Sequence, residues 1–293
     1  MSTLLCAYAN GNYTVELYDD GTKIKRTEAE VMLADFPDSI DLKITDRCDM
    51  LCPMCHERST PQGRHGNTDL PFLKTLPRGM EVAIGGGNPL SHPALVPFLR
   101  QLKAQGQIAN LTVNERHFLK RQDFLQNLLD EKLVYGLGIS LCDFADETID
   151  FAQKHENCVL HLIAGVTLQK NIRKLENRAL KLLILGYKNF GRGKTFFTSA
   201  VRLRIADMRE YLRLYADRFR VVSFDNLALE QMETEKSVGE EVFRRHYMGR
   251  DGEASMYVDL PNGQYAVSSV SEERFPLSDN LQTMFQKIRK AGG

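Results

Sequence analysis

The sequence lacks the charge imbalance and the long apolar segments that are typical of proteins acting on nucleic acid or in membranes. Lysine plus arginine and aspartate plus glutamate number 38 each, so the formal net charge is zero. A balanced chain creates no overall field toward nucleic acid, which is therefore not an expected partner, and it slightly favours a small substrate. No segment approaches about 20 uninterrupted apolar residues, and no basic segment precedes a long apolar run at the start. We expect no membrane association and a cytoplasmic location.

Cysteine is also scarce, with six residues in a chain of 293. Three of them, Cys48, Cys52 and Cys55, fall within the segment 44–59 (ITDRCDMLCPMCHERS), and no fourth follows them. The other three stand alone and indicate core or surface thiols. In a reducing compartment, clustered cysteines bind metal or carry chemistry more often than they form disulfides.

Apolar, strand-like runs alternate with amphipathic helical runs along most of the chain. The strand-like runs are 39–45, 81–87, 108–114, 135–143, 158–167, 181–187 and 220–226. The clearest helical runs are 92–106, 121–133, 146–156 and 204–219. This alternation predicts a parallel sheet covered by helices. We therefore expect an α/β fold, a partial (β/α)6-type TIM barrel with β-hairpin additions at both ends.

Both ends of the chain depart from the alternation. Residues 12–27 and 255–270 place an Asp-Gly or an Asn-Gly turn between alternating strands, so each segment predicts a β-hairpin. We expect the two hairpins to pair or pack together, and an amphipathic helix over 279–291 to close the domain. The expected organisation is an N-terminal hairpin extension (1–38), the partial barrel (39–232) and a C-terminal cap of hairpin and helix (233–293).

The cysteine segment begins where the first barrel strand ends, on the face of a parallel barrel that carries the active site. Three thiolates can bind three irons of a four-iron cluster and leave the fourth iron open for an exogenous ligand. The alternative is a zinc site completed by His56, His65 or a distant residue. Zinc sites usually combine two separated pairs of ligands, so the spacing favours the cluster.

The spacing Cys48-x3-Cys52-x2-Cys55 after the first strand of a βα repeat resembles that of the radical S-adenosylmethionine (SAM) superfamily. The resemblance extends over roughly residues 39–226. It implies a [4Fe-4S] cluster on the three cysteines, with the amino and carboxylate groups of SAM on the open iron. It also implies an electron donor such as flavodoxin or ferredoxin, cleavage of SAM to methionine and a 5′-deoxyadenosyl radical, and abstraction of hydrogen from a substrate. In such enzymes the protein positions and shields cofactors that do the chemistry.

A glycine-rich turn after the strand-like run 81–87 adds to the resemblance. The family usually has Gly-Gly-Glu-Pro here, and this chain has Gly86, Gly87, Asn88 and Pro89. Glycine lets the backbone approach a ligand that a Cβ would block. The resemblance implies that Gly86, Gly87 and Asn88 meet the amino group of SAM. Asn88 can still accept a hydrogen bond, without the charge assistance of the usual carboxylate.

Three further positions match SAM contacts of the family. Met54 precedes the third cysteine, where the family often has an aromatic residue near the adenine, and it offers a polarisable contact instead. Ser140, near the end of the fourth strand, matches a polar position that commonly meets the ribose; the alternative is a strand serine satisfied by the backbone. Gly186 follows the sixth strand, where adenine is usually held by apolar and main-chain contacts.

The loop after the sixth strand suggests a substrate class. Residues 186–194 (GYKNFGRGK) place Lys188, Arg192 and Lys194 on a glycine-rich loop at the expected active-site face. Cationic side chains and a glycine-rich backbone can together bind phosphate or carboxylate. We therefore expect an anionic small molecule or nucleotide as the substrate. The alternative is a solvated basic turn.

His161, Asp225 and Asn226 are further candidates for substrate contacts. His161 alternates with apolar neighbours and can face the barrel lumen, although a lone strand histidine is more often a satisfied core residue. Asp225 and Asn226 end the seventh strand on the same face.

Three functions remain open from the sequence. The first is a radical SAM enzyme acting on a small molecule or nucleotide. The second is the same chemistry on a peptide or a nucleic-acid base, against which the neutral charge and the absence of a recognition module count. The third is a zinc-stabilised binding protein without catalysis.

Overall fold

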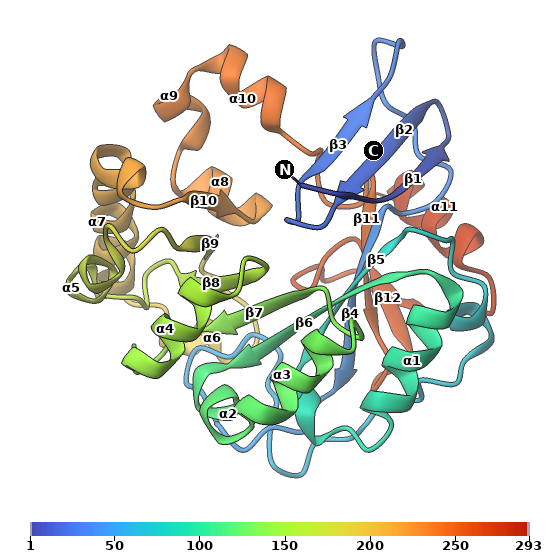
Figure 1. Ribbon diagram of the computed structural model, residues 1–293, viewed down its shortest axis with the longest axis horizontal. Helices are drawn as coiled ribbons and strands as arrows, with labels where there is room; N and C mark the ends of the chain where they lie inside the picture. The colour runs from blue at the N-terminus through green and yellow to red at the C-terminus, as the bar shows by residue number, and fades with distance from the viewer. Residues whose placement is uncertain (1, 292–293) are drawn as a thin grey trace.

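The computed structural model describes residues 2–291, which form one large sheet, one small sheet and helices around them (Figure 1). The strands are β1 (Leu4–Asn10), β2 (Tyr13–Tyr18), β3 (Lys23–Arg26), β4 (Ser39–Thr45), β5 (Glu81–Gly86), β6 (Ile108–Asn114), β7 (Gly136–Ser140), β8 (Cys158–Ile163), β9 (Lys181–Leu185), β10 (Val221–Phe224), β11 (Ser255–Asp259), β12 (Gln264–Ala266) and β13 (Phe275–Pro276). The α-helices are α1 (Leu95–Gln105), α2 (Glu115–Lys120), α3 (Gln122–Asp130), α4 (Asp146–Lys154), α5 (Gln169–Ile172), α6 (Gly193–Phe196), α7 (Ser199–Tyr215), α8 (Asn226–Gln231), α9 (Thr234–Val238), α10 (Glu240–His246) and α11 (Leu281–Ala291). Short 3-10 helices are η1 (Pro71–Lys74), η2 (Pro89–Ser91), η3 (Arg173–Leu175) and η4 (Ala216–Arg218).

The large sheet has ten strands in the order β10-β9-β8-β7-β6-β5-β4-β11-β12-β13. Neighbours from β10 to β11 pair in parallel, and β12 and β13 add an antiparallel edge. Within residues 2–291, β10 and β13 remain opposite edges that do not pair, so the barrel is partial and open. The predicted α/β class and the seven predicted barrel strands are confirmed.

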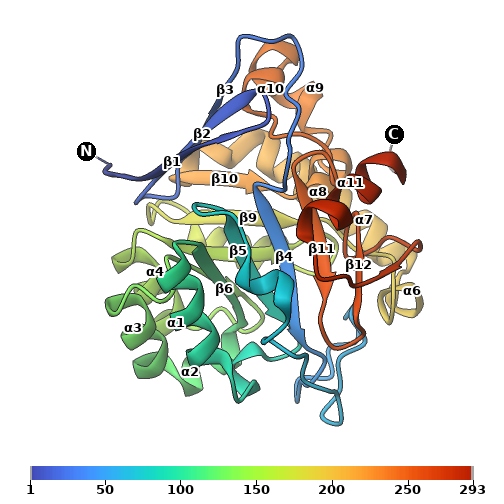
Figure 2. The same cartoon turned by 90° about the vertical axis from the view of Figure 1, so that its right-hand side faces the viewer.

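Side chains of the barrel strands alternate between two environments. Ile40 and Leu42 on β4 and Ile84 on β5 are at most 1% exposed and belong to the core under the helices. The positions between them, such as Asp41 and Lys43, point into the barrel. Helices α1 to α4 cover the outer face of β5 to β8 (Figures 1 and 2). The strands are therefore covered by helices on their outer face and partly buried in the barrel interior on their inner face, as is usual for parallel sheets.

The small sheet β1-β2-β3 lies over the end of the barrel at which its strands begin (Figure 2). Asp38, which is 1% exposed, joins the two sheets: it accepts a hydrogen bond from Tyr13 Oη at 2.9 Å and pairs with Lys25 Nζ at 2.7 Å. On the other side of this end, Lys181 Nζ at the start of β9 donates to the carbonyl oxygen of Asp20 at 2.8 Å. The small sheet thus closes the amino end of the barrel.

The C-terminal hairpin forms as predicted from β11 and β12, but the expectation that it pairs with the N-terminal hairpin is wrong. The two hairpins belong to different sheets. β11 lies beside β4 in parallel, with Tyr257 opposite Asp41 and Asp259 opposite Lys43. The reason is that β4 would otherwise be an edge strand with unpaired backbone groups.

The predicted last helix is confirmed as α11, and its Met284, Phe285 and Ile288 are fully buried. The longest described helix, α7, has 17 residues. No helix within residues 2–291 combines the length and the apolar character needed to cross a lipid bilayer.

Candidate active site

The cysteine segment is a folded-back loop anchored on the end of β4. Its two arms are joined by backbone hydrogen bonds from Cys48 N to Thr60 O at 2.8 Å and from Asp46 N to Arg64 O at 2.8 Å. At the tip, Cys55 N donates to Cys52 O at 3.2 Å, which closes a tight turn between the second and third cysteines. The three thiols are free and partly buried, and all three border one cavity. The folded loop therefore brings the three closely spaced cysteines to the same cavity.

A second loop, residues 186–194, packs directly on the cysteine loop. Arg192 donates from Nε to Cys52 O and from Nη1 to Ser59 O, both at 3.0 Å, and its backbone N–H donates to Cys55 O at 3.1 Å. Gly191 has φ +57°, and a Cβ there would collide with the carbonyl oxygen of His56. The glycines and the arginine that suggested an anion site are thus engaged by the backbone of the cysteine loop.

The glycine-rich turn at the end of β5 forms the opposite rim. Gly87 N donates to Thr45 O and Asn88 N to Arg47 O, both at 2.7 Å, and a Cβ at Gly87 would collide with Arg47 O. Gly85 differs, because a Cβ built there has no atom within 4 Å. Gly85 therefore leaves open space beside the cavity, while Gly87 permits close packing of the turn on the cysteine loop.

The cavity between these loops has a volume of about 500 Å³ and lies at the carboxyl ends of the parallel strands. Nine of the residues singled out in the sequence line it: Cys48, Cys52, Met54, Cys55, His56, Gly86, Gly87, Ser140 and Lys188. Polar groups that the sequence reasoning did not single out also border it, among them Asp41, Thr112, Asn114 and Asn171. For Asp41, Thr112 and Asn114 a signal was available, since each polar side chain interrupts or ends an apolar strand-like run, whereas Asn171 lies in a polar segment and gave none.

Seven of the sequence-predicted residues are not among those that line this cavity: Asn88, His161, Gly186, Arg192, Lys194, Asp225 and Asn226. The Asn88 side chain accepts a hydrogen bond from Leu90 N and caps η2. Asp225 caps α8 and accepts from Gly186 N at 2.9 Å. Asn226 Nδ2 donates to Asp251 at 2.6 Å. Lys194 is half exposed and lies 3.9 Å from Glu272.

His161 borders a second cavity, of about 580 Å³, between the barrel lumen and the small sheet. Its ring lies over Gly138, where a Cβ would collide with it. His161 is 8% exposed, its Nδ1 has no hydrogen-bond partner in the described chain, and burial lowers its pKa to about 4. It is therefore neutral at physiological pH, facing the lumen on the far side from the cysteines.

A buried ionic network lies beside the cysteine loop and holds it to the neighbouring strands. Lys43 is 4% exposed, and its Nζ lies 2.6 Å from Asp46, 2.7 Å from Glu57 and 3.1 Å from Asp259. Tyr257 Oη donates to Glu57 at 2.9 Å. Buried charges need such partners, because desolvation of an unpaired one costs several kcal/mol. The network joins β4, the cysteine loop and β11.

The pKa values of the network follow from this pairing. Burial alone would lower the pKa of Lys43, but Glu57, Asp46 and Asp259 outweigh it and raise the pKa above its ordinary value. Burial alone would raise the pKa of Glu57, but His56 and Lys43 outweigh it and lower the pKa far below its ordinary value. Both groups are therefore charged across the physiological range.

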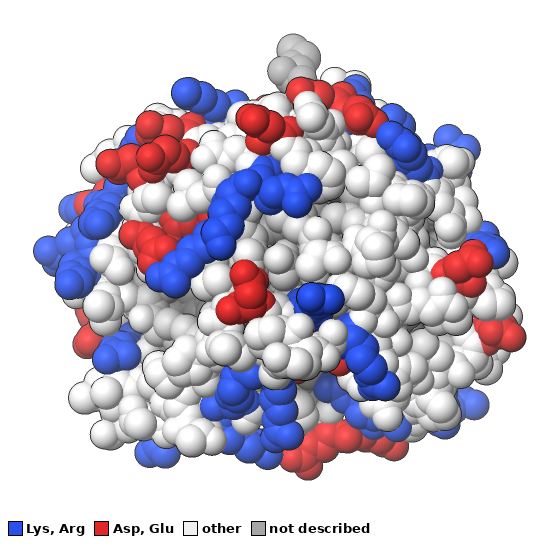
Figure 3. Space-filling model, turned by 90° about the horizontal axis from the view of Figure 1, so that it is seen from below, with Lys and Arg blue, Asp and Glu red and all other residues white. Residues whose placement is uncertain are grey.

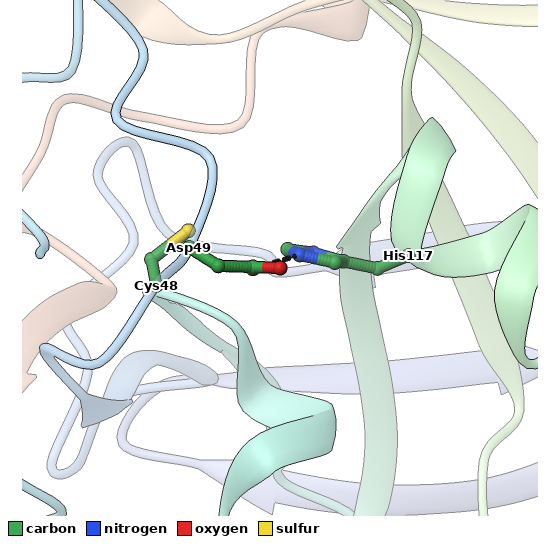
Figure 4. A group of neighbouring side chains, drawn as sticks. All are labelled: Cys48, Asp49 and His117. Atoms are coloured by element: carbon green, nitrogen blue, oxygen red, sulfur yellow. Dashed lines mark hydrogen bonds and ion pairs between the residues drawn. The ribbon is translucent and has the colours of Figure 1, made fainter. Parts of the chain in front are cut away.

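Close to the first cysteine, His117 Nε2 on α2 donates a 2.6 Å hydrogen bond to the Asp49 carboxylate (Figure 4). Cys48, Asp49 and His117 offer ligand atoms that lie within 4.8 Å of one another, whereas the three cysteine sulfurs do not form such a group in the described chain. The three thiols border one cavity without forming a compact group of ligand atoms of this kind.

Comparison of the sequence with known proteins gives a match that covers part of the chain. No known protein-family profile matches the chain. The tungsten-containing aldehyde ferredoxin oxidoreductase cofactor-modifying protein of Pyrococcus furiosus is 31% identical over 144 residues. The match covers 46% of this chain and 37% of that protein, so the chain matches well under half of the relative's length.

The fold is similar to crystal structures of Streptococcus suis SuiB. SuiB bound to S-adenosylmethionine has a TM-score of 0.62 at 11% identity, over 97% of this chain and 88% of that chain. SuiB bound to the precursor peptide SuiA has a TM-score of 0.61 at 14% identity, over 89% of this chain and 67% of that chain. At these identities the likeness establishes a common fold.

The expectation of a small-molecule substrate is wrong in the light of the SuiB complex with a precursor peptide. The expectation depended on Lys188, Arg192 and Lys194 as free cations. Arg192 is bonded to the cysteine loop, Lys188 Nζ donates to Ser269 Oγ at 2.9 Å, and Lys194 lies near Glu272. Arg192 is therefore not free to bind a ligand, whereas Lys188 borders the cavity and keeps its positive charge beside a neutral hydroxyl. By fold, the chain is similar to a protein that has been crystallised with S-adenosylmethionine and with a peptide.

Proposed function

We propose that the chain is a radical SAM enzyme that abstracts hydrogen from a peptide. The observation that carries the proposal is that Cys48, Cys52 and Cys55 border one cavity at the carboxyl ends of the parallel strands. The glycine-rich turn at the end of β5 lies on the opposite side of that cavity. Three thiolates with no fourth protein ligand suit a four-iron cluster that keeps one iron open. The cysteine–zinc alternative is less well supported, because zinc sites usually combine two separated pairs of ligands, whereas the three cysteines form a single cluster in the sequence.

Each part of the site has a role in this proposal. A bound cluster and SAM would supply the electron and the radical. Cys48, Cys52 and Cys55 would ligate three irons, and iron coordination would offset the burial that raises the pKa of the Cys48 and Cys52 thiols. The open space at Gly85 would accept part of SAM, and Gly86 and Gly87 would hold the turn in place. Ser140 and Met54 border the same space.

The peptide substrate is proposed from two observations. SuiB, which has this fold, was crystallised with a precursor peptide. Figure 3 shows the face on which the segment after β4 lies, at the bottom of Figure 1, with basic and acidic groups scattered among uncharged surface. A surface of mixed sign offers no continuous basic patch to a nucleic acid, whose binding is dominated by phosphate contacts.

The proposal is tested by anaerobic reconstitution of the chain with iron and sulfide. About four irons per chain and release of 5′-deoxyadenosine from SAM on addition of dithionite are expected. A reconstituted chain that binds zinc in preference to iron, or that leaves SAM intact, would contradict the proposal. Product release is measured by liquid chromatography, with a reaction lacking dithionite as the blank.

A further inference from the structure

Asp41 is the acidic residue of the cavity wall that the proposed chemistry leaves unused. It lies on β4 between Ile40 and Leu42, which are buried in the core, and it points the other way, into the cavity. Its neighbours across the sheet are Ala83 on β5 and Tyr257 on β11. The small Ala83 side chain leaves the space beside the carboxylate open.

The other charged groups of this wall already have partners. Glu57 is paired with Lys43 and accepts a hydrogen bond from Tyr257, and Lys188 donates to the neutral hydroxyl of Ser269 and keeps its positive charge. Asp41 has no hydrogen bond to another side chain and no lysine or arginine nitrogen within 4.0 Å among the residues that the structure describes. Its two oxygens, with about four lone-pair positions, are therefore available to a ligand.

The surroundings of Asp41 favour a positive ligand. Burial raises its pKa; Lys188 opposes the rise, while Asp251, Asp225 and Glu57 add to it. Desolvation is the largest of these costs of keeping Asp41 charged and the neighbouring carboxylates add to it, although the side chain itself stays accessible in the cavity. A cation that binds beside Asp41 would offset these costs, whereas a second anion would increase them.

We propose that Asp41 is a specificity-determining residue that receives a cationic side chain, lysine or arginine, of the peptide substrate. The inference rests on the proposed function and gives it a substrate class. An alkylammonium or guanidinium group would donate charge-assisted hydrogen bonds to the carboxylate, and such bonds are about twice as strong as neutral ones. The inferred charge of the bound substrate group is positive, whereas the loop 186–194 had suggested a negatively charged substrate.

The test uses four small probes with the reconstituted chain in the presence of SAM. Nα-acetyl-lysine amide and Nα-acetyl-arginine amide carry a cationic side chain. Nα-acetyl-norleucine amide and Nα-acetyl-citrulline amide are their respective neutral counterparts. Binding is measured by titration calorimetry in the wild type, in Asp41→Asn and in Asp123→Asn. Asp123 is the matched control, an exposed carboxylate in the first turn of α3.

The wild type and Asp123→Asn should bind one or both charged probes at least about tenfold more tightly than the neutral ones, and Asp41→Asn should lose that preference. A lysine preference and an arginine preference distinguish the two side chains. Equal binding of charged and neutral probes by the wild type, or a preference that survives in Asp41→Asn, would overturn the inference.

Two further readouts separate this inference from the proposed function. Iron content and SAM affinity of Asp41→Asn should match the wild type; a loss of SAM affinity would show that Asp41 serves the cofactor and would overturn the inference. Failure of the wild type to assemble a cluster would contradict the proposed function instead. The probe preference can be measured on the iron-free chain in that case.

Discussion

At the scale of single residues, the loop 186–194 shows how a pattern of cations and glycines can have another use than the one it suggests. Its cations and glycines predicted an anion site, and the structure uses Arg192 to bind three backbone groups of the cysteine loop. Nothing in the local sequence distinguishes a guanidinium that meets a ligand from one that meets carbonyl oxygens. The distinction depends on which distant segment lies opposite, and Cys52 is 140 positions away.

Replacement of Arg192 by Ala should loosen the cysteine loop and speed the loss of iron. Two hydrogen bonds from a charged donor are removed, each worth about 1.5–3 kcal/mol to the loop. The measurement is the rate of iron release to a chelator from the reconstituted chain. Lys194→Ala is the matched control from the same loop and should release iron at the wild-type rate. Equal rates for both variants would mean that Arg192 does not hold the loop.

At the scale of elements, the order and type of the barrel strands could be predicted because their signal is local. Segments in which apolar residues alternate or follow one another, separated by amphipathic helical segments, predict the strands β4 to β10 and their order. The place of β11 beside β4 could not be predicted in the same way, since the pairing joins Asp259 to Lys43 across most of the chain. The cysteine segment and the glycine turn lie side by side because they follow adjacent parallel strands, β4 and β5.

The two glycines of the β5 turn provide a matched pair. Gly85→Ala should leave the free energy of unfolding nearly unchanged, because its Cβ meets no atom within 4 Å, but it should weaken SAM binding by filling the cavity. Gly87→Ala should destabilise the fold, because its Cβ collides with Arg47 O. Thermal unfolding and SAM titration of both variants check this. Normal SAM affinity in Gly85→Ala would place SAM elsewhere.

At the scale of the whole molecule, the Lys43 network ties together segments that are far apart in the sequence. It links β4, the cysteine loop and β11 through Asp46, Glu57 and Asp259. A lone lysine within the strand-like run 39–45 indicated that it needs a partner, but the sequence did not identify the partners. The fold thus holds the cysteine loop by a pairing that only the complete sheet creates.

This network predicts a pH dependence of stability. The folded-state pKa of Glu57 lies below its ordinary value of 4.5, so its ionised form stabilises the fold above that pH. The stabilisation should decline as pH falls below about 4.5 toward the depressed folded-state pKa. Chemical unfolding of the iron-free chain between about pH 3 and 7 should show a deficit of Glu57→Gln that is constant near neutral pH and shrinks progressively below about pH 4.5. A deficit that is independent of pH would contradict the pairing; the exposed Glu28→Gln should show no deficit.

The central claim, that Cys48, Cys52 and Cys55 are the protein ligands of one four-iron cluster, is tested most directly by the iron content of single Cys→Ala variants after anaerobic reconstitution. Each of the three variants should lose the cluster, together with the electron paramagnetic resonance signal of its reduced form. Cys158→Ala should retain about four irons per chain, because this cysteine is buried in the core away from the cavity. A full complement of four irons in Cys52→Ala would contradict the account.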